Sequence, residues 1–279
     1  MLHLLWRHAR LLRAGVAIGL SLTAPAVLAL SGSLAPSENF DLRRWKLTLP
    51  NGDEVDPHLL NSGFSYAGAF YTDSRTGGMV FRCPNRAATT ANSNYSRSEL
   101  RGMLDPDNSN AKAASNNWTP EQGGWLKAQL RVDRVSVTGE SAKVGRVVIG
   151  QIHGPETEPL RLYYSKKPGQ RTGRIYAASE TIGGSTRYSP DIVSSAGDGG
   201  IPLGERFRYS IKLDRTRLDV LIYRADGRIH RWSTYIDARY LGRAQYFKAG
   251  VYNQNNTGDR SDYAQATFFA LQQVSPYPQ

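Results

Sequence analysis

Residues 246–254 read Tyr-Phe-Lys-Ala-Gly-Val-Tyr-Asn-Gln. The even positions of this stretch carry Tyr, Lys, Gly, Tyr and Gln, whereas Phe247, Ala249 and Val251 are apolar. Because successive side chains of a β-strand point to opposite faces, the alternation predicts a strand with one polar face and one face in a core. Gly250 lies in the polar set and leaves space for something to approach the backbone.

The rest of the 279-residue chain shows the same kind of pattern. Short alternating, β-branched or aromatic segments are separated by clusters of Gly, Pro, Asn, Asp and Ser; they are 126–137, 145–153, 206–213, 217–223 and 245–254. We find no long helical period and no repeat of fixed length. The sequence therefore predicts an all-β domain, either a two-sheet sandwich or a jelly roll.

Two polar stretches, 105–124 and 183–200, are too long for tight turns. We interpret them as loops over a binding face, with ordinary surface loops as the alternative.

The N-terminal stretch has the features of an export signal. Arg7, Arg10 and Arg13 precede an apolar run from about residue 14 to residue 30, with small residues at its end. We predict a signal peptide over 1–29, a Ser/Pro linker over 30–38 and a catalytic domain over 39–279. A membrane anchor is the alternative, since the run approaches the length of a spanning helix. The mature protein is then secreted or periplasmic.

The charge of the chain indicates an acidic partner. Removal of 1–29 takes away three arginines and no carboxylate, which lowers the formal charge from +11 to +8. A basic surface attracts nucleic acid, anionic lipid or acidic polysaccharide, and export argues against nucleic acid. We expect a monomer that does not bind a membrane in its mature form. Cys83 is the only cysteine, which excludes an intrachain disulfide and a cysteine-based metal site.

A second polar segment, 95–101, reads Tyr-Ser-Arg-Ser-Glu-Leu-Arg. Its odd positions place Arg97, Glu99 and Arg101 on one face of a predicted strand, with Leu100 on the other. This face is charged but internally paired.

A third segment, 146–153, reads Arg-Val-Val-Ile-Gly-Gln-Ile-His. Gln151 and His153 share a face at the end of a strongly apolar strand. Taken singly, each of the three segments could be an ordinary solvated sheet face with cross-strand pairs.

Taken together, the segments supply the groups that elimination on a uronate polymer requires. The C5 proton becomes acidic only when the adjacent carboxylate is neutralised, and Arg, amide and imidazole groups can do that. Tyr252 is the natural proton donor and acceptor, because a cation beside a phenol can lower its pKa.

These three segments, in this order, closely resemble the alginate lyases of polysaccharide lyase family 7. The opening Trp45-Lys46-Leu47-Thr48-Leu49-Pro50 and the pair Asn92-Ser93 also resemble that family. The resemblance covers essentially the whole mature domain. It implies a β-jelly roll of two antiparallel sheets with an open, positively charged concave cleft.

The resemblance also implies residue roles. Arg97, Gln151 and His153 would neutralise the substrate carboxylate, with His153 also the base for guluronate. Tyr252 would be the acid, and also the base for mannuronate. Five further residues match positions that bind substrate or support the site in that family: Asn92, Glu99, Arg101, Lys248 and Gln254.

The predicted activity is cleavage of mannuronate and guluronate polymers by β-elimination, most simply endolytic. The resemblance also implies a preference for guluronate-containing blocks, because Ile lies between Gln151 and His153 at position 152. No cofactor is expected, and no metal either, because His58 and His230 lack partners at metal-ligand spacing.

Three alternatives stay open. The first is a lyase for another polyuronate such as glucuronan, and the second is a non-catalytic module that binds acidic polysaccharide. The third is a glycoside hydrolase, but it would need two carboxylates at the bond and Glu99 is the only one in the three segments.

Overall fold

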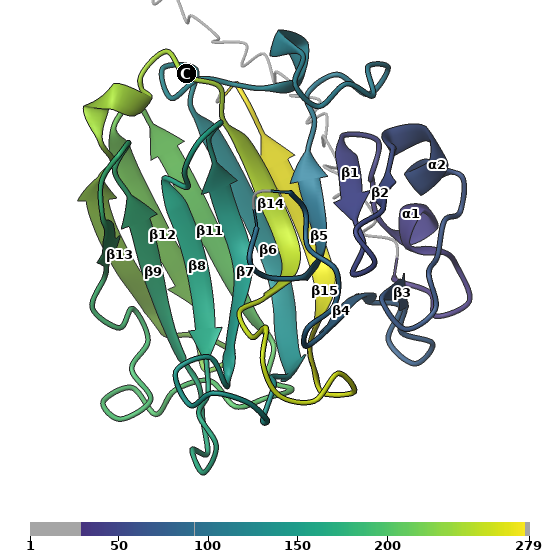
Figure 1. Cartoon of the computed structure of the whole chain (residues 1–279), viewed down its shortest axis with the longest axis vertical. Coiled ribbons are helices and arrows are strands. Elements are labelled where there is room, and N and C mark those ends of the chain that lie inside the picture. The colour runs from purple at the N-terminus through teal and green to yellow at the C-terminus, as the bar shows by residue number, and fades with distance from the viewer. Residues whose placement is uncertain (1–28, 92, 277–279) are drawn as a thin grey trace, which may run out of the picture.

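The computed structural model describes residues 29–91 and 93–276, and within them the chain forms two packed β-sheets (Figure 1). The eight-stranded sheet faces the viewer. Its strands, in spatial order, are β10 (Thr186–Tyr188), β9 (Arg174–Glu180), β8 (Leu160–Ser165), β7 (Arg146–His153), β14 (Tyr246–Asn253), β5 (Arg97–Gly102), β1 (Trp45–Thr48) and β2 (Glu54–Val55).

The second sheet lies behind the first and has seven strands. They are, in spatial order, β13 (Ile229–Tyr235), β12 (Arg217–Tyr223), β11 (Phe207–Asp214), β6 (Gly124–Arg134), β15 (Tyr263–Val274), β4 (Met79–Pro84) and β3 (Phe70–Thr72). Every strand pair in both sheets is antiparallel. The predicted all-β sandwich of antiparallel sheets is confirmed.

Within residues 29–91 and 93–276, helical structure is limited to single turns. They are α1 (Pro36–Asn39), α2 (Pro57–Asn61), η1 (Ala114–Asn116) and η2 (Ala238–Tyr240). In the described part of the chain, no helix has the length and apolar character needed to cross a membrane. The proposed signal peptide falls almost entirely outside the described residues. Part of the predicted linker lies on the domain, because it includes the start of α1 and Leu30, which packs against the core.

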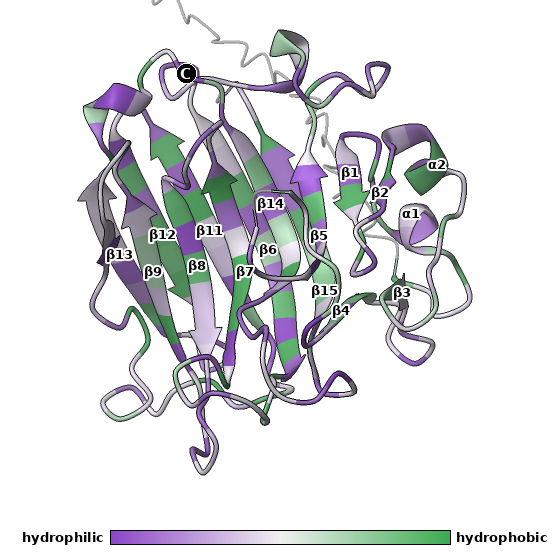
Figure 2. Ribbon diagram, in the orientation of Figure 1, coloured by the Kyte–Doolittle hydropathy of each residue, from purple (hydrophilic) through white to green (hydrophobic). Residues whose placement is uncertain are grey.

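The core forms between the sheets because the strands alternate. Figure 2 shows apolar and polar residues in bands along the strands. In β6 the apolar members of the alternation, Leu126, Ala128 and Leu130, are buried. Phe81 packs against Phe268 with ring centroids 5.2 Å apart, which joins neighbouring strands of the seven-stranded sheet.

Two of the predicted boundaries change. Stretch 183–200 contains the edge strand β10, so it is not one continuous loop. Its three residues pair with β9 and are too few to show alternation. The predicted strand 126–137 begins at Gly124 and ends at Arg134.

Candidate active site

The three polar segments identified in the sequence form adjacent strands β5, β14 and β7. Lys248 pairs with Arg101 on one side and with Gln151 on the other. Tyr252 pairs with Arg97. Directly opposed residues of antiparallel strands share a face, so these side chains lie together on the face that points away from the second sheet. We call it the site face.

A buried carboxylate organises the centre of the site face. Glu99 is fully buried, and one of its oxygens lies 2.6 Å from Lys248 Nζ and 3.3 Å from Arg97 Nη1. Its other oxygen accepts a hydrogen bond from Gln151 Nε2 at 2.5 Å. Burial raises the pKa of Glu99, but Lys248 and Arg97 outweigh it and hold that pKa below its ordinary value. Glu99 is therefore a charged acceptor that fixes three donors.

The cations around Glu99 are themselves buried. Lys248 is 5% exposed, and burial followed by the charge of Arg97 lowers its pKa to about 8. Arg97 and Lys248 place two positive charges against one negative charge, so the cluster has an excess of positive charge while Lys248 is protonated. An excess of buried positive charge favours the approach of an anion.

The hydroxyl of Tyr252 has a defined hydrogen bond in the resting protein. Ser93 Oγ donates to the carbonyl of Tyr95 at 2.9 Å and accepts from Arg97 Nη2 at 2.8 Å. Tyr252 Oη lies 2.9 Å from the same Ser93 oxygen, whose only proton is already used, so Tyr252 is the donor. The Arg97 guanidinium carbon also lies 4.0 Å from the centre of the Tyr252 ring.

Burial keeps Tyr252 protonated. The side chain is 7% exposed, and this burial raises the pKa of Tyr252, although Arg97 and the Ser93 hydrogen bond lower it. We expected the neighbouring cation to produce a lowered pKa. The net shift is in the opposite direction because desolvation of the phenolate outweighs the charge of Arg97. In the resting protein Tyr252 is therefore suited to donate a proton.

His153 is suited to accept a proton rather than to donate one. Its Nδ1 lies 2.5 Å from the carbonyl oxygen of Gly154, so Nδ1 carries the proton and Nε2 keeps its lone pair. The ring stacks on Tyr246 with centroids 5.0 Å apart. Burial, followed by the charge of Lys248, lowers the pKa of His153 to about 4. At neutral pH His153 is uncharged and can accept a proton at Nε2.

Three residues near the site were not among the predicted site residues. Glu158 Oε1 lies 3.4 Å from His153 Nε2, so it would stabilise an imidazolium. Ser93 binds Tyr252, and Tyr246 supports His153. Tyr246 shares the polar parity of its strand and could have been included on that ground. Glu158 and Ser93 lie in loops, where no periodic signal exists.

Arg101 and Gln254, which were also predicted, are not part of the Glu99 cluster. Arg101 Nη2 donates to the Ala111 carbonyl and to Asn117 Oδ1, both at 2.6 Å. Arg101 therefore anchors the 105–117 loop, a supporting role. Gln254 is 3% exposed, and its Nε2 has no hydrogen-bond partner in the described part of the protein. Asn92 lies outside the described residues.

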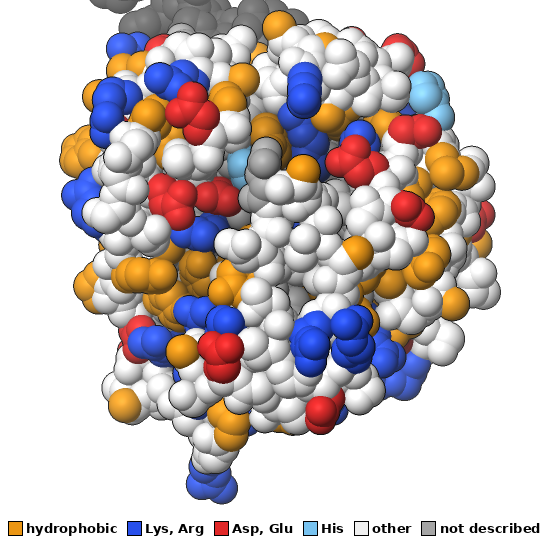
Figure 3. All heavy atoms as spheres, in the orientation of Figure 1, with side chains coloured by type: hydrophobic (Ala, Val, Ile, Leu, Met, Phe, Trp, Pro, Cys, Tyr) orange, Lys and Arg blue, Asp and Glu red, His pale blue; other side chains and the backbone are white. Residues whose placement is uncertain are grey.

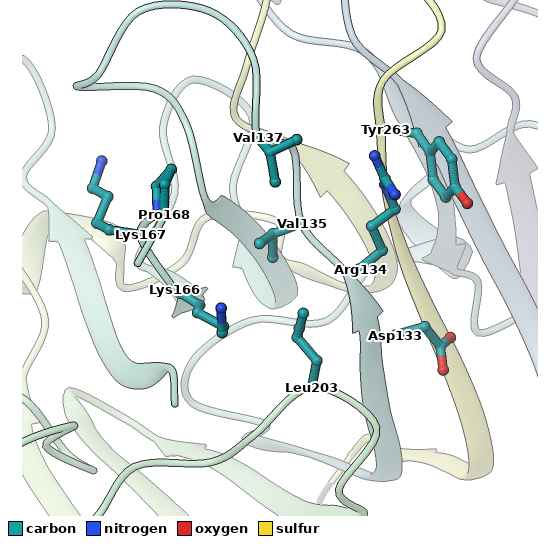
Figure 4. A pocket seen from close by; sticks show the side chains of 9 residues that line it. All are labelled: Asp133, Arg134, Val135, Val137, Lys166, Lys167, Pro168, Leu203 and Tyr263. Atoms are coloured by element: carbon teal, nitrogen blue, oxygen red, sulfur yellow. The ribbon is translucent and has the colours of Figure 1, made fainter. Parts of the chain in front are cut away.

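Two cavities within the described residues do not include these groups. A cavity of about 360 Å³ lies between Arg134, Lys166, Leu203 and Tyr263 (Figure 4). Another of about 440 Å³ lies on the outer face of the seven-stranded sheet, beside Arg208. The candidate site is thus part of a sheet face. Within residues 29–91 and 93–276, no group of three or more His, Cys, Asp and Glu residues is arranged to hold a metal ion.

A two-sheet β-sandwich that carries Arg, Gln, His and Tyr on three central strands is the architecture of a polysaccharide lyase with a β-jelly-roll fold. The sequence profile of the alginate lyase family matches residues 40–274. The chain belongs to this family, the alginate lyases of polysaccharide lyase family 7.

Individual relatives agree with this assignment. The chain is similar to an alginate lyase of Klebsiella pneumoniae, with 35% identity over 303 residues, 94% of this chain and 97% of the relative. The crystal structure of the K. pneumoniae alginate lyase superposes with a TM-score of 0.80 and 33% identity, covering 86% of this chain and 98% of that one. Alginate lyase PA1167 of Pseudomonas aeruginosa gives a TM-score of 0.68 and 27% identity, covering 84% and 99%.

Proposed function

We propose that this polysaccharide lyase cleaves alginate by β-elimination within the chain, with Tyr252 and His153 as the proton-transfer groups. The observation that carries the proposal is the buried Glu99 cluster. It holds Arg97 and Gln151 beside a protonated phenol, and His153 lies on the same face as a neutral imidazole.

The reaction needs an anion site beside a base and an acid. Arg97 and the second amide N–H of Gln151 would bind the substrate carboxylate next to C5, which stabilises the charge that develops there. The C5–H bond breaks, its electrons form the C4–C5 double bond, and the C4–O4 bond breaks. O4 leaves with a proton from Tyr252.

The resting protonation states favour guluronate units. His153 is neutral and can remove the C5 proton at Nε2, whereas Tyr252 is protonated and can donate to O4. For mannuronate Tyr252 would have to lose its proton first, against a raised pKa. Together with Ile152, this supports a preference for guluronate-containing blocks.

One relative was crystallised with replacements of a Tyr and a His, the residue types of Tyr252 and His153. Alginate lyase A1-II' with Tyr replaced by Phe was crystallised with its product GGG; it is 28% identical, with a TM-score of 0.70, covering 87% of this chain and 100% of that one. The same enzyme with a His-to-Asn and a Tyr-to-Phe replacement was crystallised with its substrate GGMG. These pairs support Tyr252 and His153 as the groups of the present chain.

Tyr252→Phe tests the assignment. We expect turnover to be lost while binding of alginate is largely retained, because only the hydroxyl is removed. Arg97→Ala should weaken both turnover and binding. The measurements are ultraviolet absorbance of the unsaturated product and polymer binding by calorimetry.

Tyr235→Phe is the matched control, since Tyr235 lies on β13 of the other sheet and is 65% exposed. Full activity of Tyr252→Phe would rule out the mechanism. A chelator in the wild-type assay tests the metal-free chemistry, because loss of activity would show that a metal is required.

Export and a monomeric state belong to the same proposal. The arginines before the apolar run and the small residues at its end support cleavage after residue 29. Mass spectrometry of the protein recovered outside the cytoplasm should show a chain that begins at Leu30. Size-exclusion chromatography should give the mass of one chain.

A further inference from the structure

The site face continues beyond the catalytic strands to the edge of the sheet. Gln151 pairs with Arg161 of β8, Arg161 pairs with Ala178 of β9, and Ala178 pairs with Tyr188 of β10. These residues form one cross-strand row. Three strand spacings separate its ends, a distance of roughly 14 Å. The row therefore extends from the reaction centre over a length that exceeds a single sugar unit.

Tyrosines line one side of this row. Tyr163 and Tyr176 stack in parallel, with centroids 4.8 Å apart and an interplanar angle of 5°. Tyr188 lies 6.1 Å from Tyr176, tilted by 52°, and is 59% exposed although its neighbours are buried. Figure 3 shows hydrophobic side chains gathered in a recess on this part of the face, next to Lys and Arg side chains.

Cations border the same recess. Arg161 pairs with Glu180, yet its buried Nε has no hydrogen-bond partner in the described part of the chain. The guanidinium has five N–H donors, so the ion pair leaves donors for another anion. The Arg174 guanidinium carbon lies 4.7 Å from the Tyr176 ring centre. The exposed ring of Tyr188, in the same cross-strand row as the Arg161 guanidinium, suits a ligand with an apolar face and a carboxylate, which describes a uronate unit.

We propose that Tyr188 and Arg161 hold an additional uronate unit of the polymer, at a distance from the bond that is cleaved. This inference rests on the proposed function and extends it. It makes the enzyme selective for chains long enough to reach β10, because only those chains contact Tyr188. Tyr188 would be a binding residue that contributes through KM.

The test compares kcat/KM on alginate polymer with kcat/KM on the shortest oligomer that the wild-type enzyme cleaves. Tyr188→Ala should lower the ratio of these two values on the order of two- to tenfold, the range expected for one exposed aromatic contact. The change should appear in KM for the polymer. Tyr188→Phe, which retains the ring, should keep most of the wild-type ratio.

Tyr235→Ala is the control, because Tyr235 is equally exposed but lies on the other sheet. An unchanged ratio in Tyr188→Ala, or equal losses on polymer and oligomer, would overturn the inference while leaving the proposed function intact. Absence of elimination on every chain length by the wild-type enzyme would instead refute the proposed function.

Discussion

Burial decides the protonation states of the two proposed proton-transfer groups. His153 and Tyr252 are each pushed towards the neutral form, since the surroundings of both solvate charge poorly. Glu99 is more deeply buried than either, but it is charged because Lys248 and Arg97 contact it directly. The site thus combines a neutral imidazole, a neutral phenol and a fixed ionic support on one sheet face, which suits the proposed base and acid.

The lowered pKa of His153 has a consequence for stability. Its pKa is about 4 in the folded protein and 6.5 ordinarily, so the unfolded chain binds the proton first as the pH falls. Acidification through this window therefore favours unfolding. The titration of His153 should lower the free energy of unfolding of the wild type by about 2 kcal/mol between about pH 7 and about pH 5. Urea unfolding at both pH values, on the wild type and on His153→Asn, measures this. An equally steep loss in His153→Asn would contradict the assigned pKa.

At the level of elements, an irregularity in β7 directs the site residues outward. Val148 contacts Tyr252 on the site face, and Ile149 lies in the core. Strict alternation would then turn Gln151 into the core. The pairing shifts next to Gly150 on both sides of β7, with one extra residue of β7 opposite β8 and one extra residue of β14 opposite β7. These shifts return Gln151 to the site face.

Tyr209 of the opposite sheet supports this irregularity, because its hydroxyl donates to the Ile149 carbonyl at 3.0 Å. Tyr209→Phe should lower the free energy of unfolding by about 1 to 3 kcal/mol, and should also reduce kcat, since Gln151 follows two residues later. Tyr164→Phe is the matched control; Tyr164 is equally buried and donates to the Ile201 carbonyl at 2.8 Å, away from the site. If Tyr209→Phe and Tyr164→Phe lose the same stability and have the same kcat, the irregularity does not position the site residues.

Alternation in the sequence predicted the strands, and parity along β5 and β14 predicted that Arg97, Glu99 and Lys248 share one sheet face. It could not reveal the shift in β7, which depends on pairing with neighbouring strands. It also could not reveal that Arg101 binds a loop. Gly250 does show the predicted close approach of another group to the backbone. The φ of Gly250 is +142°, and a Cβ added there would lie 2.7 Å from the Ser98 carbonyl oxygen.

At the scale of the molecule, the sandwich explains how the enzyme can act on a polymer. The seven-stranded sheet covers one side of the eight-stranded sheet and completes the core, which leaves the other side to carry polar groups (Figure 1). A site on a sheet face can accept a chain that continues in both directions. The expected charge of +8 after removal of 1–29 would attract a polyanion to it.

The central claim is that this protein breaks a uronate polymer by elimination, and the masses of its products test that claim most directly. The purified protein is incubated separately with polyguluronate, polymannuronate, alginate and glucuronan, and the fragments are analysed by mass spectrometry with ultraviolet detection. We predict fragments of guluronate-containing alginate that have an ultraviolet-absorbing end and lack the water that hydrolysis would add. Fragments that have gained water and do not absorb would contradict the account, as would cleavage of glucuronan alone.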